Sequence, residues 1–437
     1  MRLLKLFIPL IILLLSPVAN SESFNILNAI SDSGDIKLVK EMIKNKKYTV
    51  YIEGENIQID DFIDDYGDVR FESLPKIKVA RYKKHISFQS LKNSIVIDRE
   101  GKVRKLNLIE PDYSDIDLIN KFADLDTLYI SGLSSKEPLD LSSFESLEYL
   151  MLFDNKSTEI IFPRINKIKT INIMYTDVEI LSGLEYVSQL ESLDLVYTKL
   201  RSLSGFEKLR NIKRLDLHTI GESFAGKVSL FNLNDIKYLT VDGGNLSQTK
   251  DISKLENLTY LIITEVDRLD EVVLSKKLES LIVTALNSNA FPQIENCENL
   301  NFLKITDANF TSVPDLKRLT KLKEVKLENN QLKDIAGLRK LVNLEELYLK
   351  DNNISQISDL AGLKKLRLLD LEDNQIKSVS GLRDMPSLKA VNFENNPVES
   401  VDFEMVDQFK GVMFNISETP FHETSTLEQR KRMGMYY

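Results

Sequence analysis

The stretch LKEVKLENNQL, residues 322–332, recurs as LEELYLKDNNI (344–354), LRLLDLEDNQI (366–376) and LKAVNFENNPV (388–398). Each copy begins 22 residues after the one before, and the shared pattern is L-x-x-L-x-L-x-x-N-x-L with apolar exchanges. The alternation within this pattern is the period of a strand that has one buried face. The stretch therefore predicts one strand per copy, with Leu347 and Leu349 in the core and Tyr348 facing solvent.

Weaker copies extend the same register toward the N-terminus. All starts together fall at Val103, Leu125, Leu147, Ile168, Leu190, Ile212, Ile236, Leu258, Leu278, Leu300, Leu322, Leu344, Leu366 and Leu388. A period of this kind indicates a solenoid, in which each coil packs on its neighbours. The motif resembles the leucine-rich repeat family, in the 22-residue form typical of bacterial internalin-type proteins. The resemblance implies a leucine-rich repeat solenoid, an α/β-type horseshoe or arc, with a parallel concave β-sheet and a 3₁₀ or irregular convex side. It covers residues 103–408, in about fourteen repeats.

An asparagine follows each strong strand, at Asn330, Asn352, Asn374 and Asn396. We expect its side chain to satisfy backbone groups that the chain reversal leaves unpaired inside the coil. Apolar residues then recur at intervals of three, as between Ile335 and Leu341, which suits a 3₁₀-like return segment. Earlier copies keep the asparagine only at Asn155. The middle coils are therefore expected to be less regular than the C-terminal ones.

Both ends of a solenoid need a cover. Residues 22–102 fit the repeat poorly and are expected to form an N-terminal cap, with a short helix over 33–46. Residues 93–108 predict a hairpin whose second strand is the first repeat strand. Residues 409–437 are expected to form a C-terminal cap and tail. Val412, Phe414 and Ile416 close the last coil, and residues 418–437 are expected to be a mobile tail.

The first residues resemble a secretory signal. Arg2 and Lys5 precede the apolar run 6–15, which is too short to span a bilayer, and small residues follow at 19–21. We therefore expect residues 1–21 to be a cleaved Sec-type signal peptide without a lipobox, and no integral membrane segment after its removal. The chain shows no wall-sorting motif. The expected location is secreted or periplasmic.

Charge and cysteine content narrow the class of partner. The chain has 57 basic and 66 acidic residues, a net charge of −9. An acidic balance argues against a nucleic-acid partner, because phosphate binding needs a basic surface. The single cysteine, Cys297, leaves no intramolecular disulfide, which favours a bacterial origin over an animal or plant one.

Three features could carry chemistry, and each also has a structural explanation. GESFAGKV at residues 221–228 resembles a phosphate-binding loop, but Val228 stands where that loop needs a hydroxyl. Cys297 occupies a core slot of the repeat and is expected to be a small buried hydrophobe. His218 beside Asp216 could hold a cation, although such a group is more often a solvated acidic spot. We predict no catalytic residue, no cofactor and no metal site, and therefore no enzyme.

Large apolar side chains stand in outward slots of several strands. Exposed apolar groups usually mark an interaction surface, and tyrosine and methionine are enriched in interface cores. The candidate partner-binding residues are Tyr129, Tyr149, Met151, Phe153, Met174, Tyr175, Tyr197, Tyr238, Tyr260, Ile262 and Phe302. The alternative is that these side chains only stabilise strand pairing. In the C-terminal repeats the same slots hold charged residues, such as Lys326 and Glu372, which indicate plain wet surface.

These patterns together predict an exported interaction module that binds a protein partner through the concave sheet face. The internalin resemblance implies a host-surface or envelope protein as the partner. We expect a monomer. Two alternatives stay open. One is an envelope structural or self-associating protein that uses the same patch, and the other is an enzyme or nucleotide-dependent regulator.

Overall fold

The computed structural model describes residues 35, 49–52, 58–60, 93–98, 102–218, 224, 228–230, 233–243, 249–266, 269, 272–286, 288–409 and 411–434. The expected signal peptide, most of the expected N-terminal cap and most of the segment 221–228 lie outside these residues, as does the predicted helix over 33–46 apart from Asp35. The chain divides into an N-terminal unit (1–190, 195–208 and 220–223) and a C-terminal unit (191–194, 209–219 and 224–437).

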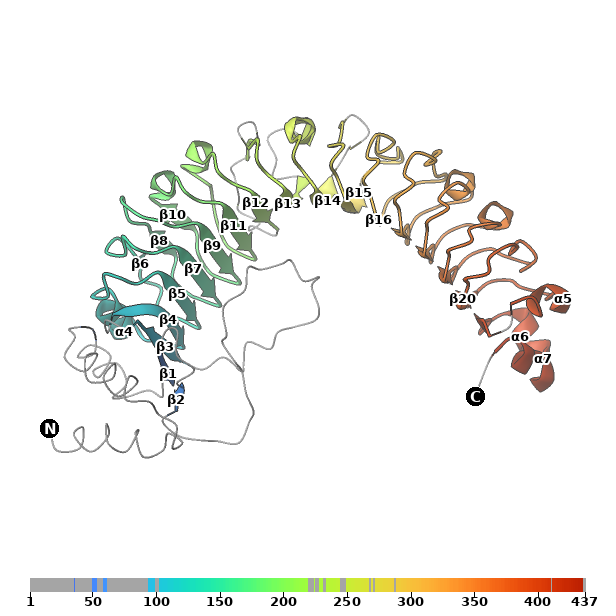
Figure 1. Ribbon diagram of the computed structural model, residues 1–437, viewed down its shortest axis with the longest axis horizontal. Coiled ribbons are helices and arrows are strands. Elements are labelled where there is room, and N and C mark those ends of the chain that lie inside the picture. The colour runs from blue at the N-terminus through green and yellow to red at the C-terminus, as the bar shows by residue number, and fades with distance from the viewer. Residues whose placement is uncertain are drawn as a thin grey trace. The chain divides into compact units, whose positions relative to one another are not determined.

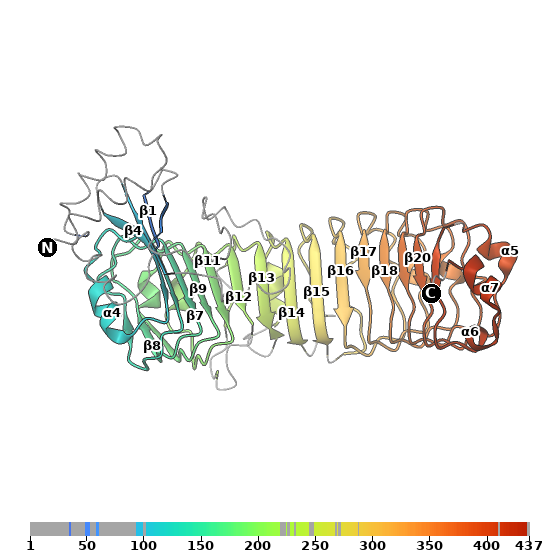
Figure 2. The same ribbon diagram turned by 90° about the horizontal axis from the view of Figure 1, so that it is seen from below.

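The N-terminal unit is built on a sheet of parallel repeat strands, which Figure 1 and Figure 2 show from two directions. Its main-sheet strands are β1 (Thr49–Ile52), β2 (Gln58–Asp60), β3 (Ser94–Ile97), β4 (Val103–Ile109), β5 (Thr127–Ser131), β7 (Tyr149–Phe153) and β9 (Thr170–Met174). A second, three-stranded parallel sheet on the return side comprises β6 (Leu139–Asp140), β8 (Glu159–Ile161) and β10 (Ile180–Ser182). The unit also contains helix α4 (Tyr113–Ile119) and the 3₁₀ helices η2 (Leu184–Tyr186) and η3 (Phe206–Lys208).

Strand β11 (Ser192–Val196) contributes residues to both units. The further strands of the C-terminal unit are β12 (Arg214–Leu217), β13 (Tyr238–Asp242), β14 (Tyr260–Val266), β15 (Ser280–Leu286), β16 (Phe302–Thr306), β17 (Glu324–Lys326), β18 (Glu346–Tyr348), β19 (Leu368–Asp370), β20 (Ala390–Asn392) and β21 (Met413–Asn415). They pair in parallel, each with the next along the chain. The helices are η5 (Thr249–Lys254), η6 (Ala336–Leu338), η7 (Ser358–Leu360), α5 (Phe403–Val406), α6 (Pro420–Thr424) and α7 (Leu427–Arg432).

The predicted phase of the repeat is confirmed. In β7, Leu150 and Leu152 are buried, whereas Tyr149, Met151 and Phe153 alternate with them on the solvent side and are half-buried. A strand follows every repeat start from Val103 to Leu388. The core is therefore the stack of inward residues that successive strands and return segments contribute. The prediction of a leucine-rich repeat solenoid with a parallel sheet is confirmed.

The asparagine after each strong strand ties its coil to the preceding one. In Asn352, Oδ1 accepts the Leu332 N–H (3.0 Å), and Nδ2 donates to the carbonyl oxygens of Leu327 (2.9 Å), Leu349 (3.0 Å) and Lys350 (3.1 Å). The side chain is only 6% exposed. Buried backbone groups need such partners, since an unpaired one costs about 1–3 kcal/mol.

At the N-terminal edge the structure agrees with the prediction from sequence, and at the C-terminal end it differs. Strand β3 pairs antiparallel with β4, so the predicted hairpin is confirmed, and β1 pairs in parallel with β3 beyond it. The mobile tail predicted from residue 418 is wrong. Helices α6 and α7 form there, with capping threonines at Thr419 and Thr426, and Met433 is fully buried. The Phe414 N–H donates to the Met433 carbonyl (3.0 Å), so this segment covers the edge of β21.

Replacing Asn352 by Ala tests the role of the asparagines. The change leaves several backbone groups of two coils unpaired in the core, so the free energy of unfolding should fall by about 1–3 kcal/mol or more. Asn353→Ala is the matched control, because Asn353 is exposed. Urea unfolding of the purified variants measures both values. Equal stability of the two variants would contradict this role.

Candidate interaction surface

The solvent face of the N-terminal unit has no charged side chain on three adjacent strands. Parallel register aligns β5 with β7 and β7 with β9, so that their outward residues form three rows. The nine outward residues are Thr127, Tyr129, Ser131, Tyr149, Met151, Phe153, Thr170, Asn172 and Met174. We call them the uncharged face. In a chain with 28% charged residues, this composition resembles an interface core, where charge is depleted and aromatic residues and methionine are enriched.

Hydrogen bonds and ring contacts hold the side chains of the uncharged face in place. The Asn172 amide, itself 7% exposed, donates to the Tyr149 hydroxyl (2.9 Å). The ring of Phe153 meets the ring of Tyr175 edge-on, with 5.4 Å between centroids. Burial raises the pKa of Tyr129. The predicted residues of this unit are therefore brought together, with Met174 beside Phe153 in the sheet.

Tyr175 and Tyr197 stand one residue beyond the ends of β9 and β11, at the turn, and not in the alternation of the strands. Their rings stack, with centroids 4.8 Å apart and planes at 16°, and they are 51% and 46% exposed. The neighbouring Val196 is buried, so it adds no exposed surface. The uncharged face therefore continues at one edge into a pair of exposed aromatic rings.

The backbone under this tyrosine pair is strained. Tyr175 and Tyr197 have φ values of 55° and 52°, in the left-handed region that bulky residues rarely adopt. Most other coils place an acidic residue or asparagine in this slot, namely Glu110, Asp154, Glu265, Asp307, Asn329, Asp351, Asp373 and Asn395. The residue after each tyrosine, Thr176 or Thr198, takes the place of the ladder asparagine, and its buried hydroxyl finds no hydrogen-bond partner among the described residues. Strain and lost hydrogen bonds that gather under an exposed feature are typical of functional sites.

The second predicted group lies in the C-terminal unit. Tyr238 aligns with Tyr260 across β13 and β14, with ring centroids 6.1 Å apart, and Ile262 aligns with Ile282. Phe302 follows on β16, and all of these side chains are half-buried. Thr264 and Thr284 lie in the next row, which ends at the buried Thr306. This group is thus apolar but more deeply packed than the tyrosine pair.

The outward slots of the last coils are charged, as the sequence predicts, and the charges pair with one another. The Lys350 ammonium lies 2.5 Å from a Glu372 carboxylate oxygen, and Lys326 lies 3.0 Å from Glu324. The Tyr348 hydroxyl donates to Glu346 (2.8 Å). Surface of this kind contributes little to binding, because its polar groups are already satisfied.

The group around His218 is an ion-pair network. The Arg214 Nε donates to both Asp194 carboxylate oxygens (3.0 and 3.1 Å), and the Arg214 guanidinium lies 3.6 Å from Asp216. His218 Nδ1 lies 3.4 Å from Asp242. Burial, with the nearby charge of Asp194, raises the pKa of Asp216 to about 6. Among the described residues no group of three His, Cys, Asp or Glu side chains is placed to hold a metal ion, and an arginine occupies the space between the two carboxylates.

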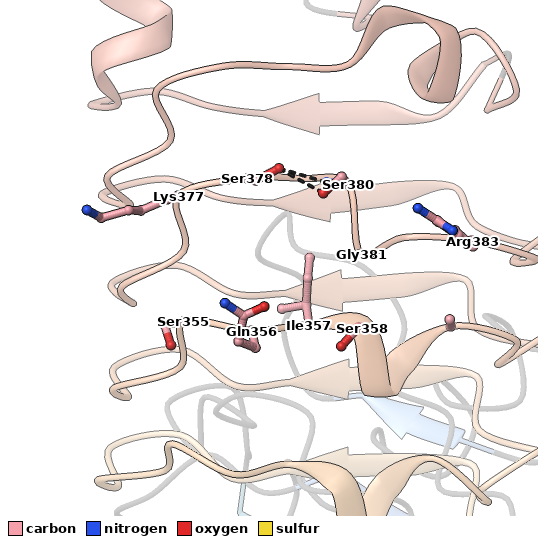
Figure 3. Close-up of a pocket in the computed structure, with 10 residues that line it drawn as sticks. Ser355, Gln356, Ile357, Ser358, Lys377, Ser378, Ser380, Gly381 and Arg383 are labelled. Atoms are coloured by element: carbon pink, nitrogen blue, oxygen red, sulfur yellow. Dashed lines mark hydrogen bonds between the residues drawn. The ribbon is translucent and has the colours of Figure 1, made fainter.

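Two other features lie away from the sheet face. Cys297 is fully buried, and burial raises the pKa of its thiol to about 12, which makes it a core residue. A cavity of about 420 Å³ lies on the return side, between the segments 355–361 and 377–383 (Figure 3). Serine hydroxyls line it, and Lys377 and Arg383 stand at opposite ends. Sequence reasoning missed this cavity, because its lining residues carry no motif.

Comparison with known proteins agrees with this fold. Family models described as "Leucine Rich repeats (2 copies)" and "Leucine rich repeat" match residues 320–362 and 342–398. A leucine-rich repeat protein of Leptospira interrogans is 22% identical, with a TM-score of 0.62 over 77% of this chain and 89% of its own. An internalin, InlF of Listeria monocytogenes, is 20% identical, with a TM-score of 0.46 over 65% of this chain and 79% of its own. No curated protein matches the chain in sequence.

Residues 320–398 therefore match leucine-rich repeat family models, and the chain has the leucine-rich repeat solenoid fold. Within the described residues, no helix is long and apolar enough to cross a membrane.

Replacing Tyr175 and Tyr197 by Asn tests whether the two exposed rings contribute to the stability of the fold. Asn adopts the left-handed conformation readily, which offsets the loss of a ring contact worth about 0.5–1.5 kcal/mol. We expect the free energy of unfolding of the double variant to stay within about 1 kcal/mol of the wild type. Urea unfolding checks this, with Leu152→Ala as a control that should lose about 2–5 kcal/mol. A loss as large as the control's would show that the rings hold the coils together.

Asp216→Asn tests the ion-pair network through its pH dependence. Because folding raises the pKa of Asp216 from 3.8 to about 6, the folded state holds this proton more tightly, and its stability falls as the pH rises between these values. The variant lacks the ionisable carboxyl, so its stability relative to the wild type should increase from pH 4 to pH 7. Thermal unfolding at both values measures the difference. A relative stability that stays level or falls from pH 4 to pH 7 would contradict the raised pKa of Asp216 and would mean that attraction to Arg214 outweighs the cost of burial.

Proposed function

We propose that this chain is an exported, non-enzymatic interaction module that binds a protein partner through the uncharged face and the tyrosine pair. The single observation that carries the proposal is the strained, exposed stack of Tyr175 and Tyr197. What sets these two coils apart is that a bulky aromatic residue occupies the left-handed slot, which most other coils fill with an acidic residue or asparagine. Natural folds break local rules in this way mainly where function requires it.

The composition of the face supports a protein partner. Tyrosine buries a large apolar area at low entropic cost and still offers a hydroxyl, so it is frequent at binding hot spots. Serine, threonine and asparagine between the aromatic residues supply hydrogen bonds without the desolvation cost of a charge. The partner surface that fits this face is likewise uncharged and partly apolar.

The proposed location and partner rest on the sequence. The signal-like segment 1–21 supports export, and a secreted or periplasmic protein meets envelope or host-surface proteins. The apolar group of Tyr238, Tyr260, Ile262 and Phe302 is a second contact area in this proposal. The proposed module acts as a monomer, and recognition needs no cofactor.

The test replaces Tyr149, Met151 and Phe153 together by Ser. Folding should survive, because the inward Leu150 and Leu152 remain. Partners are first captured on the wild-type chain from host-surface and envelope extracts, and the affinity of each purified partner is then measured by calorimetry. Because the variant removes three large side chains of the proposed hot spot, the affinity should fall by about tenfold or more.

The matched control carries Ser at the same three slots of another coil, Glu324, Lys326 and Glu328. Its affinity should stay within about twofold of the wild type, because exposed charged contacts contribute little. A purified partner that binds both triple variants as tightly as the wild type would refute the proposed surface. Sedimentation of the wild-type chain distinguishes partner binding from self-association through the same face.

A further inference from the structure

One edge of the C-terminal unit is strongly basic, although the chain as a whole is acidic. The edge consists of the residues that lead from the return segment into the strand, at 317–323, 339–345, 361–367 and 383–389. Its eleven basic residues are Lys317, Arg318, Lys321, Lys323, Arg339, Lys340, Lys364, Lys365, Arg367, Arg383 and Lys389, against the two acidic residues Glu345 and Asp384. All eleven side chains are exposed. We call these eleven basic residues the cationic stripe, which is present although the whole chain has a net charge of −9.

An ordered ladder in which asparagine and lysine alternate from coil to coil runs through this edge and extends into the coils before it. Each member directly precedes the buried leucine that opens a strand, and the order is Asn257, Lys277, Asn299, Lys321, Asn343 and Lys365. Lys277, Lys321 and Lys365 each donate through Nζ to the Oδ1 of the asparagine one coil earlier, at 2.6 Å in all three cases. We call this set the Asn–Lys ladder.

The asparagines are themselves fixed to the backbone. Asn299 Nδ2 donates to the Lys276 carbonyl (2.9 Å), and Asn343 Nδ2 donates to the Thr320 carbonyl (2.7 Å). Each amide thus links the coil before it to the lysine of the coil after it. The ladder restrains the lysine side chains and leaves their positive charge intact, because a neutral amide accepts the bond. Binding an anion there costs less side-chain entropy than binding at free surface lysines.

Carboxylates pair with four of the eleven basic residues. Glu345 is shared between Lys323 and Arg367, at 3.6 Å from each. Lys317 pairs with Asp315 within its own coil, and Arg318 lies 3.9 Å from Glu298. In the part of the chain that the structure describes, Arg339, Lys340, Lys364 and Arg383 form no salt bridge. These cations stand beside the ladder lysines in the same and adjacent coils.

The spacing of the ladder selects the shape of the anion. Parallel strands lie about 4.8 Å apart, so lysines in every second coil are about 10 Å apart along a straight row. This distance is comparable with the length of a disaccharide, so a linear polymer that carries one negative group per disaccharide would meet one ladder lysine at each repeat. The serine-lined cavity beside Arg383 offers hydroxyls, as Figure 3 shows, which suit the hydroxyl groups of a sugar.

We propose that this basic edge binds a linear anionic polysaccharide, with carboxylate or sulfate groups on the lysines of the Asn–Lys ladder. Single-stranded nucleic acid fits less well, because its binding sites add aromatic side chains on which bases stack, and the edge has none. A membrane surface would engage a broad plane of charge, whereas the cations here follow a narrow stripe. The proposal concerns a different surface from the uncharged face and does not depend on the proposed function.

The test measures binding of the purified full chain to hyaluronate, which carries one carboxylate per disaccharide, and to heparin, at low and at physiological salt. Binding should be detectable at low salt and should weaken as salt rises, because the contacts are solvent-exposed ion pairs. The ladder variant Lys277→Gln, Lys321→Gln, Lys365→Gln should lose about tenfold or more in affinity. The matched control Lys136→Gln, Lys167→Gln, Lys208→Gln changes the net charge equally at exposed lysines of the N-terminal unit and should lose less than about twofold.

Neutral dextran, an oligothymidylate and phosphatidylserine vesicles complete the assay. The proposal fails if neither anionic polysaccharide binds at low salt, or if both triple variants lose affinity equally. It also fails if the oligonucleotide or the vesicles bind as tightly as the polysaccharides and through the same lysines. Circular dichroism of each variant verifies that the coils remain folded, since exposed Lys→Gln changes remove no core contact.

Discussion

The structure depends on the requirement that every coil bury its backbone turn against the preceding coil. A coil of 22 residues cannot bury enough apolar surface to offset its conformational entropy alone, so only a stack is stable. The stack in turn places polar backbone groups in its interior, and in the C-terminal coils asparagine side chains satisfy them. Asn374 illustrates the geometry, with its amide on the Leu349 carbonyl (2.9 Å) and its oxygen on the Ile354 N–H (3.0 Å), both in the coil before it. Cohesion between coils is therefore fixed inside, and the solvent face is free to vary.

The solvent face uses that freedom differently along the chain. In the N-terminal unit three neighbouring strands present no charge, and the outward groups bond to one another, as Asn172 does to Tyr149. In the last coils the same slots hold carboxylates and ammonium groups that pair across strands, as Lys350 and Glu372 do. Charged side chains are absent from one part of the solvent face and frequent in another, so one solenoid carries surfaces of different chemistry. Such separation makes sense if the surfaces meet different ligands.

Much of the fold could be predicted, because the period is long and its slots differ in polarity. The alternation around Leu150 and Leu152 decided which side chains face solvent, and the structure agrees. The C-terminal helices were missed because each is short, although the Thr426 capping box, with Gln429 three residues later, was a legible signal. The small sheet of β6, β8 and β10 was missed because its strands have two or three residues, too few to show a period.

The candidate surface was predictable only in part. Outward aromatic residues follow from phase, so Tyr149 and Phe153 were found. The strain at Tyr175 and Tyr197 could not be seen, because the sequence does not print a backbone angle, although comparison with Asp351 and Asp373 in the same slot was possible. The Asn–Lys ladder was overlooked because the search for periodicity followed apolar residues. Polar positions that repeat across coils, such as Asn299, Lys321 and Asn343, have to be searched for in the same way as apolar ones.

The left-handed slot after each strand has a consequence for how such a chain can diversify. The turn, and not the residue, imposes its backbone angle, so the same position recurs in many coils and accepts side chains of different kinds. An aromatic residue at this position costs about 1–2 kcal/mol, while a whole domain is stable by only about 5–15 kcal/mol. A solenoid of this type can therefore hold a few aromatic residues at such positions, and a longer stack can hold more of them.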